Sequence, residues 1–237
     1  MLNANGILSV LDRAVTINWD DGPTLHKVTA QVRYHTPESA TAQLLRVSAA
    51  HRYSDDPLTF INQDTLLRAV WCWREQPPGW SAQLSIHNES ESDVFVDSLE
   101  VLRIDSAYGG VFNLGAPPGL WQCSRESDPT GLDWEAWAES TYTASGFARI
   151  SEMLIQPTVS NRTRPPSILF RFHSGTVLMP AEIRLECSGE RFDRLVARGR
   201  ADGTLLGSKA MLASPELWLA AGDDPQEVRQ WGRRAQA

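Results

Sequence analysis

The segment QLSIHNESESDVFVDSLEVLRID, residues 83–105, contains the pattern that decides the fold. Its first part alternates apolar and polar side chains with a period of two, and Leu84 and Ile86 lie in the same phase. This alternation is typical of a β-strand that buries one face. The polar stretch 88–93 that follows favours local side-chain turns. The segment therefore predicts two strands joined by a turn.

The second strand of this segment, residues 94–105, changes its apolar phase partway along. Val96 belongs to one phase and Leu99 to the other. A continuous strand cannot keep both side chains on one face unless an extra residue is inserted between them. We therefore predict a bulge or a break near Asp97-Ser98.

The same two-residue period continues almost to the end of the chain and indicates an all-β fold. Clusters rich in proline, glycine and small polar residues separate the periodic runs and mark loops. Each sheet then has one apolar face, and a two-sheet antiparallel sandwich lets the two faces cover each other. If two of the later runs pair, their polar faces form a charge ladder across the strands. The periodic runs include residues 28–34, 67–73, 168–172 and 183–187, and the last two are the runs expected to form the ladder.

The final segment, SPELWLAAGDDPQEVRQWGRRAQA from residue 214, has a different character. Asp223 or Asp224 is placed to cap a helix whose first turn contains Pro225. Val228 and Trp231 are three residues apart and share one face of this helix. A helix of about ten residues is marginal in isolation, so it needs a surface, either the sandwich or something outside this chain. We accordingly divide the chain into a sandwich domain, 1–221, and a helix, 222–237.

Composition and charge exclude several classes of protein. The 237 residues are 42% hydrophobic and 22% charged, as in globular proteins, and the formal net charge is −7. This balance argues against a nucleic-acid or anionic-membrane partner, which would favour clustered basic residues. Three widely spaced cysteines form neither a disulfide framework nor a zinc signature. No signal peptide is readable, so we expect a cytoplasmic protein. We expect neither a metal nor a cofactor.

One long, irregular segment, residues 108–142, combines aromatic and charged side chains. An indole face can pack on a pyranose ring while carboxylates and arginines bond its hydroxyls. The alternative is that these tryptophans fill the core beneath a long loop. The candidates for a carbohydrate site or an interface are Trp121, Arg125, Trp134, Glu135 and Trp137.

The order of features resembles the N-terminal β-supersandwich domain of melibiase-type α-galactosidases and raffinose synthases, which has a galactose mutarotase-like fold. In that family a strand with a polar turn leads into a second strand, and a tryptophan-containing strand followed by a helix closes the domain. Phe112-Asn113-Leu114 is similar to a motif of the mutarotases. The matching residues are Leu84, Ile86, Asn88, Val94, Val96, Leu99, Val101, Leu102 and Asp105, then Glu216, Trp218, Gly222, Asp224, Val228 and Trp231.

The resemblance implies that the chain is a non-catalytic domain. The family's catalytic aspartates lie in a (β/α)₈ barrel that follows this domain, and residues 222–237 would lead into that barrel, so no residue here is expected to be catalytic. The implied partners are a carbohydrate and a catalytic barrel domain or subunit, and a homo-oligomer is a further candidate. Two alternatives stay open. One is a free-standing mutarotase-like epimerase in which a histidine and a carboxylate act as acid and base on a sugar ring, with His87 and His173 as the candidate histidines. The other is a protein-interaction module with an exposed apolar patch.

Overall fold

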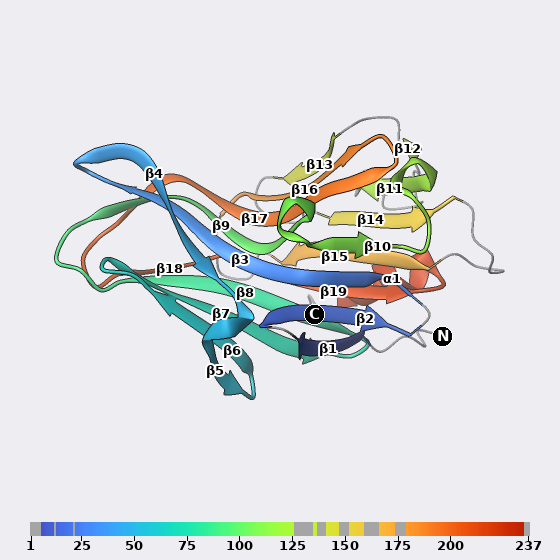
Figure 1. The fold of residues 1–237 in the computed structure, drawn as a ribbon, viewed down its shortest axis with the longest axis horizontal. Coiled ribbons are helices and arrows are strands. Elements are labelled where there is room, and N and C mark those ends of the chain that lie inside the picture. The colour runs from blue at the N-terminus through green and yellow to red at the C-terminus, as the bar shows by residue number, and fades with distance from the viewer. Residues whose placement is uncertain are drawn as a thin grey trace.

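The computed structural model describes residues 6–11, 13–20, 22–125, 135–136, 141–146, 152–158, 166–173 and 179–234. Within these ranges the chain forms two antiparallel sheets that pack face to face as layers (Figure 1). A single α-helix, α1 (Pro225–Arg234), is found among the described residues. The predicted all-β sandwich with a short C-terminal helix is therefore confirmed.

The first layer is a nine-stranded sheet, counted over the described ranges. Its main path runs in the order β1-β2-β3-β9-β17-β16-β13, and β4 and β10 also pair with β3. The strands are β1 (Gly6–Leu11), β2 (Ala14–Trp19), β3 (Thr24–Thr36), β4 (Ser39–Val47), β9 (Val94–Asp105), β10 (Val111–Asn113), β13 (Thr141–Gly146), β16 (Ala181–Ser188) and β17 (Arg191–Leu206).

The second layer is a ten-stranded sheet, counted in the same way. Its path is β12-β11-β14-β15-β19-β8-β7-β6-β5, and β18 pairs with β8. The strands are β5 (Arg52–Asp55), β6 (Leu58–Gln63), β7 (Leu67–Gln76), β8 (Gly79–Asn88), β11 (Trp121–Arg125), β12 (Glu135–Ala136), β14 (Glu152–Pro157), β15 (Ser167–His173), β18 (Met211–Ala213) and β19 (Glu216–Gly222). Three short 3-10 helices, η1 (Ala49–His51), η2 (Ser106–Tyr108) and η3 (Pro118–Leu120), lie in connections between strands.

The core lies between the two layers and is built from the predicted apolar phases. Leu84 and Ile86 of β8 are buried there, as are Trp71 and Trp73 of β7. Val28 of β3 approaches them from the other sheet and is also buried. Alternation places these side chains on the inner face because successive residues of a strand point to opposite sides.

The predicted irregularity in β9 is present. Ser98 pairs with Arg33 and Val96 with Tyr34, so Asp97 is an extra residue opposite β3. The insertion lets Val96 and Leu99 both reach the core, where both are fully buried. A second shift in the β3–β9 pairing, between Thr29 and Gln31, was not predicted.

The conditional pairing of the runs at 168–172 and 183–187 is wrong. The first run belongs to β15, which pairs with β14 and β19 in the ten-stranded sheet. The second belongs to β16, which pairs with β13 and β17 in the nine-stranded sheet. Alternation shows which face of a strand is buried, but it carries no information about the neighbouring strand.

Helix α1 lies against the outer face of the ten-stranded sheet, beside β15 and β19 (Figure 1). The Asp224 carboxylate accepts hydrogen bonds from the backbone N–H groups of Gln226 at 2.9 Å and Glu227 at 3.4 Å, as predicted for the cap. Val228 is fully buried in a cluster with Leu169. The surface that the sequence required for this helix is therefore the sandwich itself.

Candidate functional site

Trp121 lies in the core, which is the second of the two roles considered for it. Its side chain is 1% exposed, and its indole N–H donates a hydrogen bond to the carbonyl oxygen of Ala116 at 2.8 Å. The ring packs edge to face against Phe112, with centroids 5.2 Å apart. These contacts leave no indole face of Trp121 open to a sugar ring.

The other residues predicted in this segment are only partly placed. Arg125 ends β11 and pairs with Met153 of β14. Glu135 begins β12 and pairs with Cys123. Trp134 and Trp137 lie outside the described residues. Whether these four side chains bind carbohydrate stays a prediction.

The two histidines predicted for the epimerase alternative lie apart on the ten-stranded sheet. His173 pairs with Glu216, and the Leu217–Ala82 pairing places Glu216 level with Gln83 of β8, so His87 lies four residues further along β8. At about 3.3 Å per residue this offset is about 13 Å along the strand direction. The two candidate histidines therefore do not share one site.

His173 is also covered. Its ring lies 4.6 Å from the Trp218 ring, centroid to centroid, and the residue is 8% exposed. Burial, and secondarily the positive charge of Arg171, lower the pKa of His173 to about 4. Burial and the nearby Arg68 also lower the pKa of His87. Both imidazoles are therefore held toward the neutral form.

A buried ionic cluster lies under α1 that the sequence analysis did not identify. The Glu152 carboxylate on β14 accepts a hydrogen bond from the Arg171 guanidinium of β15 and forms an ion pair with the Arg229 guanidinium of α1, both at 2.5 Å. All three side chains are at most 5% exposed. Because Glu152 pairs with one arginine of the sheet and one of the helix, the cluster fixes the helix on the sheet.

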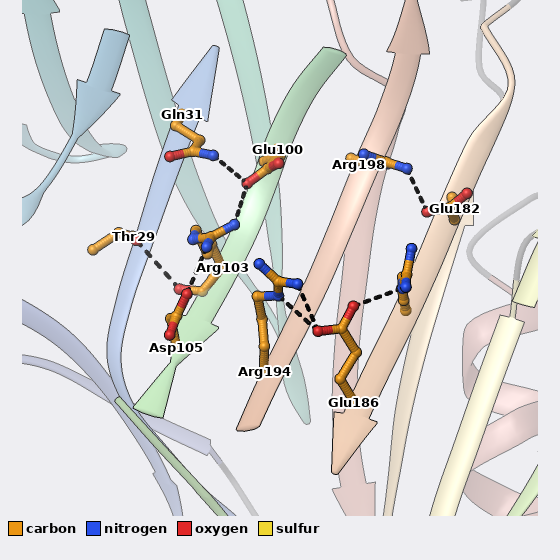
Figure 2. Close-up of polar contacts among 10 residues, drawn as sticks. Thr29, Gln31, Glu100, Arg103, Asp105, Glu182, Glu186, Arg194 and Arg198 are labelled. Carbon is orange, nitrogen blue, oxygen red and sulfur yellow. Dashed lines mark hydrogen bonds and ion pairs between the residues drawn. The ribbon is translucent and has the colours of Figure 1, made fainter. Parts of the chain in front are cut away.

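The outer face of the nine-stranded sheet carries the charge ladder; the predicted run 183–187 of β16 takes part in it, but its partner strand is β17 and not β15. Figure 2 shows its β3–β9 part, where Glu100 accepts from Gln31 at 2.7 Å and from Arg103 at 3.1 Å. Arg103 also donates to Asp105 at 2.5 Å. This network binds the Arg103 guanidinium between two carboxylates, so its charge is compensated within the sheet.

The ladder continues onto β17 and β16 (Figure 2). Glu186 accepts a hydrogen bond from Arg194 at 2.6 Å and forms an ion pair with Arg184 at 2.7 Å. Glu182 accepts from Arg198 at 2.7 Å. Half-exposed pairs of this kind contribute roughly 0–1 kcal/mol each. Their main effect is to order the polar face of β16 and β17.

A pocket of about 460 Å³ opens at the β3 end of this ladder. Its lining includes Gln31 and Thr29 of β3 and Asp105 of β9. Arg46, near the end of β4, and Tyr108 of η2 also line it. The Arg46 guanidinium lies 5.4 Å from the centre of the Tyr108 ring, within the range of a cation–π contact.

Two further cations, Arg13 and Lys27, line this pocket from strained backbone positions. Their φ angles are +61° and +54°, in the left-handed region that favours glycine. Arg13 lies in the two-residue turn between β1 and β2. Lys27 lies in a bulge of β3, because Val15 pairs with Val28 while Ile17 pairs with Leu25.

The bulge directs the Lys27 side chain to η2. Its Nζ donates to the carbonyl oxygen of Tyr108 at 3.3 Å. Gly109, with φ +77°, allows this approach, because a Cβ at that position would lie 2.8 Å from the Lys27 Nζ. The ammonium is thus held at the pocket wall by one of its three donors.

Sequence reasoning missed this pocket because its residues come from five separate segments. Thr29 and Gln31 were identified only as the polar face of a strand. The left-handed conformation of Lys27 follows from a register shift and not from a glycine or asparagine that the sequence would reveal. The one available signal was local. Arg13 and Lys27 are basic residues next to apolar, strand-like stretches, in a chain whose net charge is −7.

Comparisons with known proteins give the fold. No protein-family model and no curated protein matches the chain. The α-galactosidase from Lactobacillus brevis matches 95% of this chain and 27% of its own length, with a TM-score of 0.52 and 12% identity. A GH36 α-galactosidase from Geobacillus stearothermophilus, in complex with raffinose, matches 93% of this chain and 30% of its own length, with a TM-score of 0.51 and 11% identity.

A polysaccharide lyase also matches, over 97% of this chain and 34% of its own length, with a TM-score of 0.57 and 8% identity. At these identities the likeness shows the fold alone. The chain spans about a third or less of the length of each of these proteins. Among the described residues, no helix is long and apolar enough to cross a membrane. The chain therefore has the sandwich fold found within α-galactosidases, as the resemblance of its sequence led us to expect.

Proposed function

We propose that this chain is a non-catalytic β-sandwich domain of an α-galactosidase-like glycoside hydrolase and that it packs against a catalytic barrel. The observation that supports this most is the coverage. Nearly the whole chain, 95%, matches only 27% of the Lactobacillus brevis α-galactosidase. A chain that corresponds to one part of a larger enzyme is expected to act together with the remainder.

The match to a polysaccharide lyase means that this fold is not tied to one reaction. What favours the hydrolase is the sequence pattern from β19 into α1. Glu216, Trp218, Asp224 and Trp231 follow one another there as in the melibiase-type domain. In the structure, Trp218 and Trp231 lie against each other with ring centroids 5.2 Å apart. The pattern thus describes one packed unit.

We also propose a cytoplasmic location. Cys72 and Cys187 are free thiols. Free cysteines are usual in a reducing compartment, whereas secreted proteins tend to pair theirs.

The test begins with the coding sequence that continues from, or adjoins, codon 237. We expect it to encode a (β/α)₈ barrel. The barrel polypeptide and this chain, produced together, should elute as one complex from a sizing column and hydrolyse p-nitrophenyl α-galactoside. This chain alone should release no nitrophenol and interconvert no sugar anomers. Hydrolysis or anomer interconversion by the chain alone would overturn the non-catalytic role, and a barrel that does not bind it would overturn the domain assignment.

A further inference from the structure

The pocket of about 460 Å³ beside the charge ladder has a local excess of positive charge. Among the described residues, no carboxylate forms an ion pair with Arg13, Lys27 or Arg46. Arg103, by contrast, is held between Glu100 and Asp105. The chain as a whole has a net charge of −7, so the three cations around this pocket are a local departure from its overall charge. They create a positive potential over the pocket mouth that attracts anions.

Backbone strain places two of these cations. A left-handed conformation costs a residue with a Cβ about 1–2 kcal/mol, a cost that glycine avoids. Lys27 adopts it at φ +54° and Arg13 at φ +61°. Strain of this kind gathers at ligand sites, where the side chain is needed in that place. Bulges likewise redirect side chains next to binding sites.

The lining of the pocket suits a sugar ring better than a bare anion. Gln31, which is 6% exposed, and Thr29 present an amide and a hydroxyl, and both donate hydrogen bonds to β9, Gln31 to the Glu100 carboxylate and Thr29 to the Arg103 carbonyl oxygen. Asn62 reaches the rim and donates to the Arg46 carbonyl oxygen at 2.5 Å. Tyr108 is 64% exposed, so part of its ring is open to the C–H face of a pyranose.

We infer that this pocket binds an acidic sugar, a uronate monosaccharide or disaccharide. The carboxylate is held by Lys27 and Arg46 with Arg13 at the rim, and the ring lies toward Tyr108 over Thr29 and Gln31. The volume lies within the range of about 300–1,000 Å³ that is usual for small-molecule sites. An inorganic anion would leave most of the pocket empty. The inference does not rest on the proposed function, since the site is contained in this chain.

The test measures binding of galacturonate and digalacturonate to the full chain by titration calorimetry at low salt. Two variants, Lys27→Gln and Arg46→Gln, each remove one cation of the pocket. Lys209→Gln is the matched control, because Lys209 is exposed, lies in the turn before β18 and pairs with Glu91. Each pocket variant should weaken galacturonate binding about tenfold, the size expected for one charged hydrogen bond. The control variant should bind as the unaltered chain does.

Methyl α-galactoside and sodium sulfate test the sugar ring and the negative charge of the ligand separately. The neutral galactoside should bind at least about tenfold more weakly than galacturonate, because it lacks the carboxylate. Sulfate should bind more weakly as well, because it cannot use Tyr108 or the polar residues of the lining. Absence of galacturonate binding, sulfate binding as tight as that of galacturonate, or an equal loss in Lys209→Gln would each overturn the inference.

Lys27→Gly provides a second measurement that does not depend on knowing the best ligand. Glycine relieves the left-handed strain, so the melting midpoint should rise by about 2–4 °C relative to Lys27→Gln, while galacturonate binding is weakened to the same extent in both. A midpoint that falls would show that Lys27 is not strained and would remove that support. A rise in the midpoint together with unchanged galacturonate binding would overturn the role of Lys27 in the site.

Discussion

His173 shows how a polar residue on a strand becomes a stability determinant when a helix covers it. It lies on the outer face of β15, where alternation places it, but α1 and Trp218 bury it. The neighbouring Arg171 is fully buried as well, and its charge adds to the effect of burial on His173. The imidazole is therefore neutral in the folded chain at pH 7, and protonation would place a second cation beside a buried arginine.

The depressed pKa of His173 predicts acid sensitivity. The unfolded chain takes up a proton at this residue near pH 6.5, but the folded chain does so only near pH 4. The unfolded state therefore binds more protons between these values, so the free energy of unfolding falls as the pH is lowered through this window. From pH 7.5 to pH 5 the loss from this group is about 2 kcal/mol.

Urea denaturation at both pH values, on the unaltered chain and on His173→Gln, measures this contribution. The variant should lose about 2 kcal/mol less than the unaltered chain does, because glutamine does not titrate. His51→Gln, at an exposed position, is the control and should behave like the unaltered chain. Equal losses in His173→Gln and the unaltered chain would contradict the prediction.

At this scale the sequence predicted which face each side chain takes but not what lies over that face. Alternation placed His173 and Gln31 on polar faces, and both do lie on outer faces of their sheets. It could not show that α1 seals one of these residues while a pocket opens beside the other. Such coverage depends on contacts between distant segments, which local periodicity does not encode.

The docking of α1 is the feature that matters most at the level of elements. Val228 packs against Leu169 and Ala220 of the sheet, and the Trp231 indole N–H donates to the Pro77 carbonyl oxygen at 3.0 Å. That bond links the helix to the β7–β8 turn, far from it in the sequence. Arg229 adds an ion pair with Glu152. A helix of ten residues that is marginal alone thus becomes part of the fold.

Trp231→Ala should release this helix while the sheets stay intact. The change removes the Trp218 contact and the bond to Pro77, and for a half-buried tryptophan we expect a loss of about 2 kcal/mol. Amide hydrogen exchange should accelerate over residues 225–234, with little change in the core strands. Gln230→Ala, on the exposed side of the helix, should leave exchange slow. Uniform acceleration across both sheets would contradict local release.

Elements were easier to predict than their arrangement. The strands, the Asp97 bulge and the Asp224 cap follow from residues that are near one another in sequence. The neighbours of β15 and β16 could not be derived, because each strand fits any partner with the same alternation. The charge ladder illustrates this: its type was predicted, but its contacts form between β3 and β9 and between β17 and β16.

For the molecule as a whole, the decisive feature is that both halves of the chain contribute to both sheets. In the nine-stranded sheet, β9 lies between β3 and β17. In the ten-stranded sheet, β19 lies between β15 and β8. Neither sheet can therefore be completed by one contiguous half of the chain. Together with a core that the sheets share, this interleaving predicts a single cooperative folding unit.

The cysteines can report on each sheet separately. Cys123 is buried in β11 of the ten-stranded sheet, and Cys187 is buried in β16 of the nine-stranded sheet, where burial raises the pKa of its thiol to about 12. In a Cys72→Ser background, adding Cys123→Ser or Cys187→Ser leaves one reporter thiol. Pulsed alkylation along a urea series should give the same midpoint for both reporters, coincident with the loss of far-ultraviolet circular dichroism.

Because both substitutions remove a buried thiol, each variant's own circular dichroism transition serves as its reference. If Cys187 became reactive at a lower urea concentration than the circular dichroism transition of its own variant, the nine-stranded sheet would open independently and the single-unit prediction would be wrong.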